Sequence, residues 1–179
     1  NQYRSALFIS VHFNSGGSGT GIETYTLAPR GVPSMMADGP RISDLDPCPG
    51  HACDAQNMAL ATATHAALVV KSQMYDRGIK RARFVVLRDV TIPGVLIEGG
   101  FMSNSYDARM IASTTFRQNM ASCIVQAVQN YRRAVGAPVP DLPRPAPTVQ
   151  TSSMAAADNP AQSSPAQSNA VTPVVPFRN

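Results

Sequence analysis

Two polar side chains at the ends of apolar segments are the residues best suited to chemistry in this sequence. Glu98 follows three consecutive apolar residues and precedes two glycines in the segment 95–100 (VLIEGG). A carboxylate in that position is costly to bury unless it is paired or used. His12 ends a similar segment, residues 7–12 (LFISVH), before a turn of small residues. An imidazole and a carboxylate at strand ends suit a site that binds a metal and moves protons to and from a metal-bound water.

The elements that would position these side chains alternate between strands and helices. Alternating or continuous apolar residues predict strands at residues 5–12, 22–27, 83–87 and 94–98. Helical spacing predicts one helix from Asp54 to about Asp76, ended by Gly78, and another from Ser113 or Thr114 to Gly136. This order predicts an α/β fold in which helices cover a mixed sheet. Because the first element is already a strand beside the candidate site, we expect further strands of this sheet to precede the sequence.

Composition divides the chain into two parts. Residues 1–136 carry the predicted elements, including a long surface segment at 28–53 that has no clear periodicity. Residues 137–179 hold most of the fifteen prolines, together with Ala, Ser, Gln and Thr. Such a composition buries too little apolar surface to order itself. We therefore expect a catalytic domain over 1–136 and a disordered linker or tail over 137–179.

Charge and hydropathy limit the partners. The net charge is +4, and the excess lies in residues 1–136, which favours anionic partners such as a membrane surface or an acidic cell-wall polymer. Nucleic acid is not expected, because no basic helix or basic stripe with interleaved aromatics is present. No apolar run approaches the length of about 20 residues that spans a bilayer. The sequence does not begin with Met, and no signal peptide is recognised in it.

The cysteines and the remaining histidines do not suggest a second site. Cys48, His51 and Cys53 resemble part of a zinc motif, but no second Cys/His pair follows, so we interpret them as a loop with an optional disulfide. Cys123 lies at an apolar helix position and is expected to be buried. His65 lies in the middle of a predicted helix and is expected at the surface or partly buried.

Other polar residues near the strand ends are candidates for contacts with a substrate. Asn14 and Asn104 could orient the strand-end groups or touch the substrate, although Asn in a turn needs no such role. Arg88 could meet a substrate carboxylate or pair with a nearby acid at the surface. Glu23 alternates along a strand and is expected to be exposed rather than to replace a metal ligand.

Four ordered segments together resemble one enzyme family. Residues 7–15 (LFISVHFNS) and 21–25 (GIETY) are similar to the "SIHANS…GxExYYL" segment of zinc-dependent N-acetylmuramoyl-L-alanine amidases of the type 3 class. Residues 76–88 (DRGIKRARFVVLR) resemble the "drGvKxAxFyVLR" segment of that family. Residues 93–104 (PGVLIEGGFMSN) resemble its "PavLvExGFlSN" segment.

This resemblance implies a catalytic zinc held by His, Glu and His. The matching positions make His12 the last of the three ligands and Glu98 the carboxylate that takes a proton from water and delivers one to the leaving amine. The first His and the ligand Glu precede the strand of His12 in the family, so both are expected upstream of this sequence. The 179 residues alone are therefore expected to be inactive.

The resemblance also implies the substrate and the compartment. We expect a peptidoglycan hydrolase of the periplasm or cell exterior that detaches stem peptides from the glycan, acting as a monomer, with an activator protein as a possible partner. One alternative is a degenerate amidase fold that binds peptidoglycan or a partner protein without cutting. A hydrolase with a nucleophilic side chain is a remote alternative, because no Gly-x-Ser-x-Gly motif is present.

Overall fold

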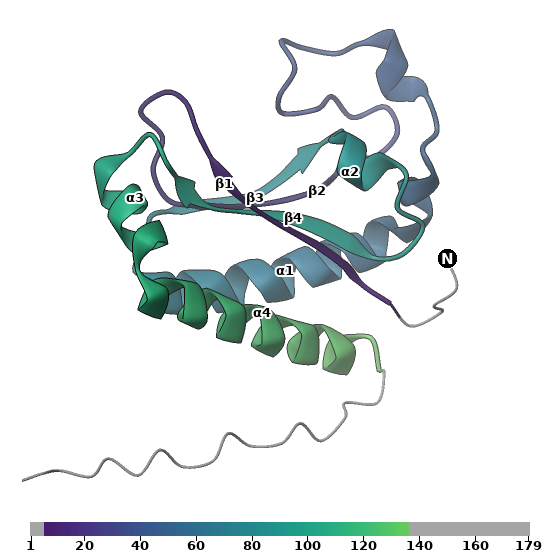
Figure 1. Ribbon diagram of the computed structural model, residues 1–179. Coiled ribbons are helices and arrows are strands. Elements are labelled where there is room, and N and C mark those ends of the chain that lie inside the picture. Colours follow the sequence, from purple (N-terminus) through teal and green to yellow (C-terminus); the bar gives the residue numbers. More distant parts are fainter. Residues whose placement is uncertain (1–5, 137–179) are drawn as a thin grey trace, which may run out of the picture. The chain divides into compact units, whose positions relative to one another are not determined.

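A mixed sheet forms the centre of the structure. The computed structural model of the protein describes residues 6–136. Within them, four strands form one sheet in the order β1-β4-β2-β3 (Figure 1). The strands are β1 (Phe8–Asn14), β2 (Ile22–Leu27), β3 (Asp76–Ala82) and β4 (Gly94–Phe101). The β1–β4 and β2–β3 pairs are parallel, whereas β2 and β4 are antiparallel. The predicted mixed α/β architecture is thus confirmed.

Two long helices cover one face of this sheet. They are α1 (Asp54–Ser72) and α4 (Thr114–Ala134), which pack against each other beneath the strands in Figure 1. The shorter α3 (Ser105–Ala112) joins β4 to α4. The other face carries the 28–53 segment, with its 3-10 helices η1 (Ile42–Leu45) and η2 (Pro49–Cys53), and the single turn α2 (Val85–Arg88).

Alternation along the central strands supplies a core on each face. Toward the helices, Ile22 and Ile97 pack with Leu68 of α1 and with Phe116, Met120 and Cys123 of α4. Toward the other face, the packed residues are Tyr25, Leu27, Ala82, Leu87 and Leu96. Because side chains two apart on a strand share a face, Glu23 and Glu98 lie on the same side as Tyr25 and Leu96. The polar site therefore lies on the face opposite to α1 and α4.

The boundaries of the first helix and the third strand differ from the prediction. Helix α1 ends at Ser72, and Gln73 takes the left-handed conformation (φ 56°) that was expected of Gly78. Gly78 instead lies within β3. The predicted strand at 83–87 was wrong, because residues 85–88 form α2.

The strand β3 lacks the apolar pattern by which strands are recognised. Its sequence is DRGIKRA, and its cations find acidic partners on neighbouring elements. Arg77 and Lys80 pair with Glu23 of β2, and Arg81 pairs with Asp54 at the start of α1. Asp54 is thus an ion-pair partner, and no side-chain hydrogen bond caps this helix. Strand β3 is thus held beside its neighbours by ion pairs, and its sequence shows no apolar alternation.

Several smaller predictions can be compared with the structure. Ser113 caps α4 as predicted, with its Oγ accepting a hydrogen bond from Phe116 N at 3.4 Å. Cys123 is buried as expected, while Cys48 and Cys53 are free thiols. No helix within residues 6–136 is long and apolar enough to cross a membrane. The expected linker at 137–179 lies outside the described residues, so the proposed domain division stays a prediction.

Candidate active site

His12, Glu98 and Glu23 form a row across three adjacent strands. In the parallel pair of β1 with β4, His12 is the Cα partner of Glu98. In the antiparallel pair of β4 with β2, Glu98 is the Cα partner of Glu23. The sheet register thus brings together an imidazole and two carboxylates that are far apart in sequence.

The carboxyl group of Glu98 is partly buried and incompletely hydrogen-bonded. Its Oε2 atom is buried and has no hydrogen-bond partner among the described residues. Burial and, secondarily, the charge of Glu23 raise the pKa of Glu98 to about 7. A carboxyl group with that pKa can both accept and return a proton near neutral pH, which is the requirement for general acid–base catalysis.

His12 remains accessible beside this carboxyl group. It is exposed on β1, and its Nε2 lies 3.0 Å from the Oγ of Ser10 on the same strand. The other histidines are occupied within the fold. His51 Nε2 lies 3.1 Å from Ala28 O, and its Nδ1 accepts a hydrogen bond from Cys48 N, which confirms a loop role.

His65 serves to connect α1 with the sheet. Its Nδ1 lies 3.0 Å from Thr24 Oγ1, and its Nε2 lies 2.8 Å from Asp76 Oδ1. The residue is 8% exposed, so it is more buried than the sequence suggested. These contacts join α1 to β2 and to the start of β3, and we assign His65 to the scaffold.

The expectation that Glu23 is exposed was wrong, because the residue is only 2% exposed. Its Oε2 accepts a hydrogen bond from Tyr25 Oη at 2.5 Å, and its Oε1 accepts from Lys80 Nζ at 2.5 Å and from Arg77 Nε. Burial alone would raise the pKa of Glu23, but these donors outweigh burial and hold the pKa below its usual value. Glu23 is therefore a fixed negative charge beside Glu98. Sequence reasoning missed this role because an alternating strand predicts one exposed face, whereas every residue of β2 is buried.

A second buried carboxylate, Asp107, fastens the loops around the site. It is fully buried and accepts hydrogen bonds from Thr20 Oγ1 at 2.7 Å, Gly21 N at 2.8 Å and Phe101 N at 2.9 Å. These donors come from the loop before β2 and from the end of β4, so one carboxylate holds the two segments that flank Glu98. The sequence gives one weak signal for it, an acid in the first turn after the helix cap Asn104.

Of the two candidate asparagines, Asn14 ends β1 and Asn104 directly precedes α3. Asn14 Oδ1 accepts a hydrogen bond from Ser15 N at 2.8 Å. Asn104 Oδ1 caps α3 by accepting from Tyr106 N at 3.0 Å and from Asp107 N at 3.2 Å. Both amide oxygens therefore have local structural roles, and contact of either residue with a substrate stays a prediction.

Arg88 is not brought to the row of His12 and Glu98. It lies in α2, after the carboxyl end of β3, whereas Glu98 lies near the amino ends of β2 and β3. Arg88 and the candidate catalytic groups therefore lie toward opposite ends of the strands, although all of them belong to the same face of the sheet.

The described residues do not by themselves form a complete metal site. Within residues 6–136, no group of three His, Cys, Asp or Glu side chains is arranged to hold a metal ion. His12, with its exposed imidazole, is the Cα partner of Glu98, whose Oε2 is unpaired, and this arrangement nevertheless fits a site in which the imidazole binds a metal and the carboxylate faces a water. The donor set agrees with zinc, which favours imidazole nitrogen.

The architecture defines an α/β domain whose polar site lies on the sheet face opposite its long helices. A sequence model of the N-acetylmuramoyl-L-alanine amidases matches residues 1–130. The chain therefore belongs to the N-acetylmuramoyl-L-alanine amidase family. This result confirms the resemblance on which the sequence interpretation was based.

Individual relatives agree with this assignment. The chain is 29% identical over 121 residues to the sporulation-specific N-acetylmuramoyl-L-alanine amidase of Bacillus subtilis (strain 168), covering 68% of this chain and 38% of that protein. It is 32% identical over 126 residues to the uncharacterized protein YqiI of the same organism, covering 70% and 50%. The solved N-acetylmuramoyl-L-alanine amidase of Clostridium difficile 630 matches at 27% identity with a TM-score of 0.54, over 72% of this chain and 58% of that one. The chain thus spans half or less of the length of these two curated relatives.

Proposed function

We propose that the protein is a peptidoglycan hydrolase that cuts the amide between N-acetylmuramic acid and the L-alanine of the stem peptide. Membership of the amidase family supports the reaction class. The observation that carries the proposal is Glu98, whose unpaired, buried Oε2 lies on the strand next to His12. An orphaned carboxylate oxygen is costly unless a ligand or water uses it.

In this proposal Glu98 moves the protons of the reaction. It accepts a proton from the attacking water and returns one to the amine nitrogen as the amide bond breaks. A pKa of about 7 suits both steps, because each protonation state is populated near neutral pH. Glu23 keeps its negative charge throughout and adds to the effect of burial, which is the main cause of the raised pKa of Glu98.

His12 is the proposed zinc ligand of this chain. Zinc, when bound, supplies Lewis acidity that activates water and polarises the amide carbonyl. The family pattern places the other two ligands, a His and a Glu, upstream of His12, and the proposal assigns them to the preceding part of the protein. The isolated 179 residues are then expected to lack amidase activity.

The proposed substrate sets the place of action. Peptidoglycan lies outside the cytoplasmic membrane, so the protein would act in the periplasm or outside the cell. We propose a monomer, with an activator protein as a possible partner.

The test is the release of peptides from purified sacculi by the full-length protein. Amidase activity gives peptides with a free N-terminal alanine, detected by mass spectrometry, and removal of metal by a chelator abolishes them. The Glu98→Gln variant should lose about a hundred- to ten-thousand-fold in rate, because an amide cannot accept the proton. Asp38→Asn, an exposed change in the 28–53 segment, is the control and should retain activity. Protein that sediments with sacculi but releases no peptide would support the binding module instead.

A further inference from the structure

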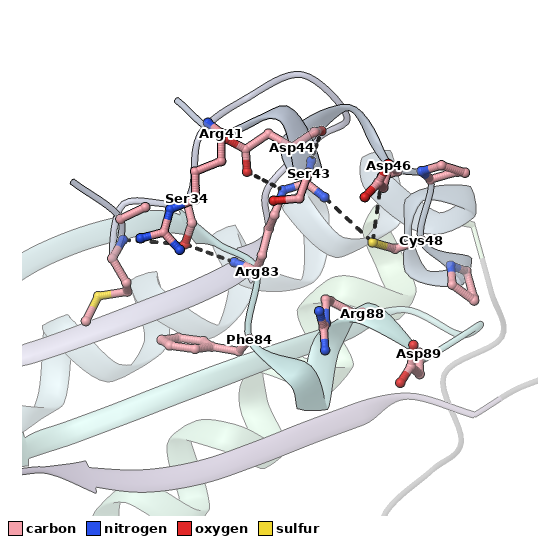
Figure 2. A pocket seen from close by; sticks show the side chains of 14 residues that line it. Ser34, Arg41, Ser43, Asp44, Asp46, Cys48, Arg83, Phe84, Arg88 and Asp89 are labelled. Atoms are coloured by element: carbon pink, nitrogen blue, oxygen red, sulfur yellow. Dashed lines mark hydrogen bonds and ion pairs between the residues drawn. The ribbon is translucent and has the colours of Figure 1, made fainter. Parts of the chain in front are cut away.

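A second concave site lies on the same face of the sheet as Glu98. It is a pocket of about 600 Å³ between the 28–53 segment and the residues that follow β3. Its size falls within the range of about 300–1,000 Å³ that is usual for ligand sites. Three arginines line it, Arg41, Arg83 and Arg88, and we call it the arginine pocket (Figure 2).

Arg83 holds the wall of the arginine pocket together. Its Nε lies 3.2 Å from Asp44 Oδ1, and its Nη2 donates to Pro29 O at 3.1 Å and to Asp44 O. Asp44 is itself 4% exposed and accepts a hydrogen bond from Arg41 N at 2.8 Å. Through this ion pair and the hydrogen bonds from Nη2, Arg83 ties the 28–53 segment to the end of β3.

Arg41 and Arg88 are different, because their guanidinium groups are free. Among residues 6–136, no acid or carbonyl forms an ion pair or hydrogen bond with either group. Both residues are exposed, and Figure 2 marks no hydrogen bond or ion pair to the Arg88 side chain. Guanidinium groups pair with carboxylates through two parallel hydrogen bonds. Two free guanidinium groups lining one pocket thus favour a ligand that carries carboxylates.

The acidic residues of the pocket indicate that this ligand also carries hydrogen-bond donors. Asp46 and Asp89 line the same space. With Arg41 and Arg88 they make a set of two cations and two anions, which suits a peptide better than a simple anion. A peptide with free carboxylates offers both the acceptors for the arginines and the N–H or ammonium donors for the acids.

Tyr25 connects the arginine pocket with the candidate active site. Its Oη donates to Glu23 and lies 3.9 Å from Met36 Sδ, and its ring meets that of Phe84 with centroids 5.0 Å apart. Met36 and Phe84 both line the pocket. Strands rise by about 3.3 Å per residue, so the part of β2 beyond Glu23 covers on the order of 10 Å. An extended peptide of three or four residues spans that distance.

We propose that the arginine pocket binds a carboxylate of the stem peptide, with Arg88 as its principal contact and Arg41 as the second. The inference rests on the proposed function, because it takes the scissile amide to lie at Glu98. It extends that function by assigning the far end of the peptide to a defined set of side chains. Arg88 then contributes to substrate binding from the pocket rather than from the catalytic row.

The experiment measures binding of a stem peptide to the full-length protein by isothermal titration calorimetry. The probe is the stem peptide still joined to N-acetylmuramic acid, whose scissile amide the Glu98→Gln background leaves uncut, and it is used with free carboxylates and with its carboxylates amidated. Arg88→Gln should weaken binding of the free peptide by about tenfold, as expected for a lost charge-assisted hydrogen bond at a partly solvated site. Arg41→Gln should weaken it in the same direction. Arg133→Gln, an exposed change on α4 at the opposite face, is the matched control and should leave binding unchanged.

The amidated peptide separates charge recognition from other contacts. It should bind the parent protein and the Arg88→Gln variant equally. Equal affinity of the free peptide for these two proteins, or no binding of it to the parent, would overturn the arginine pocket as a carboxylate site. Sacculus digestion tests the proposed function separately. Suppose that Arg88→Gln loses binding but the protein that retains Glu98 releases no peptides from sacculi. The arginine pocket would then stand as a binding site, and the proposed hydrolase activity would be rejected.

Discussion

Glu23 and Glu98 lie directly opposite each other on antiparallel strands, and their environments drive the two pKa values apart. Donors from Lys80, Tyr25 and Arg77 overcome burial and lower the pKa of Glu23. Glu98 lacks such donors, so burial and the charge of Glu23 raise its pKa to about 7. Two carboxyl groups separated in this way can divide their work, one as a permanent charge and the other as a proton carrier.

The raised pKa of Glu98 predicts a pH-dependent cost in stability. The pKa rises from 4.5 to about 7 on folding, so the folded protein binds this proton more tightly than the unfolded chain. The associated stability is complete below pH 4.5 and is lost as the pH rises to about 7. In metal-free protein, Glu98→Gln should gain stability relative to the parent across this range, by on the order of 1 kcal/mol after allowing for partial exposure.

Urea unfolding of parent and variant at pH 4 and pH 8 checks this expectation. The difference in the free energy of unfolding should move in favour of the Gln variant at the higher pH. A difference that is independent of pH would show that Glu98 titrates normally in the folded protein.

Glu23→Gln tests the origin of the shift at Glu98. The change removes one negative charge, so the pKa of Glu98 should fall, although burial keeps it above 4.5. It also leaves Lys80 and Arg77 without their anion, which should destabilise the protein by about 1–3 kcal/mol. A carbon-detected NMR titration of the Glu98 carboxyl group measures the pKa, and an unchanged value would exclude Glu23 as a cause.

His12→Ala should remove zinc from the full-length protein. Two remaining ligands bind the ion too weakly to compete with buffer, because the free energy of binding depends on the complete ligand set. The variant should lose most of its metal by atomic absorption while its circular dichroism spectrum remains that of the parent, since His12 is exposed. His51→Ala, which alters a histidine outside the row, should keep the metal. Retention of zinc in His12→Ala would contradict the assignment.

The sequence predicted those parts of the fold where local pattern and burial agree. Apolar residues precede both His12 and Glu98, and the strands that carry them, β1 and β4, were found from that pattern. Strand β3 was not found at its true position, because its residues are charged and their partners, Glu23 and Asp54, lie far away in sequence. The helix end at Gln73 was missed for a related reason, since a nearby glycine is the stronger local signal.

The candidate site also has some residues that the sequence predicted and others that only the structure revealed. Their positions at the ends of apolar segments identified His12 and Glu98, and motif similarity assigned their roles, but their adjacency depends on the sheet register, which a sequence alone does not supply. The burial of Glu23 and the bridging role of Asp107 depend on tertiary contacts with Lys80 and Thr20, among others. The arginine pocket likewise forms only when the 28–53 segment folds back onto the residues after β3.

Asp107→Asn tests the support of the loops that flank Glu98. The fully buried carboxylate accepts bonds from Thr20, Gly21 and Phe101, and one of its oxygens serves both backbone donors. An amide has one acceptor oxygen, so its NH2 group faces either the two backbone donors, which lose their partner, or the Thr20 hydroxyl, which must then accept instead of donate. With the charge also lost from the remaining hydrogen bonds, we expect a cost of about 1–3 kcal/mol for this buried group. The free energy of unfolding should fall by that amount, whereas Asp89→Asn, an exposed change of the same chemistry, should leave it nearly unchanged. Hydrogen exchange at Gly21 and Phe101 should accelerate in Asp107→Asn if the carboxylate holds these segments, and unchanged protection there would show that other contacts fix the loops.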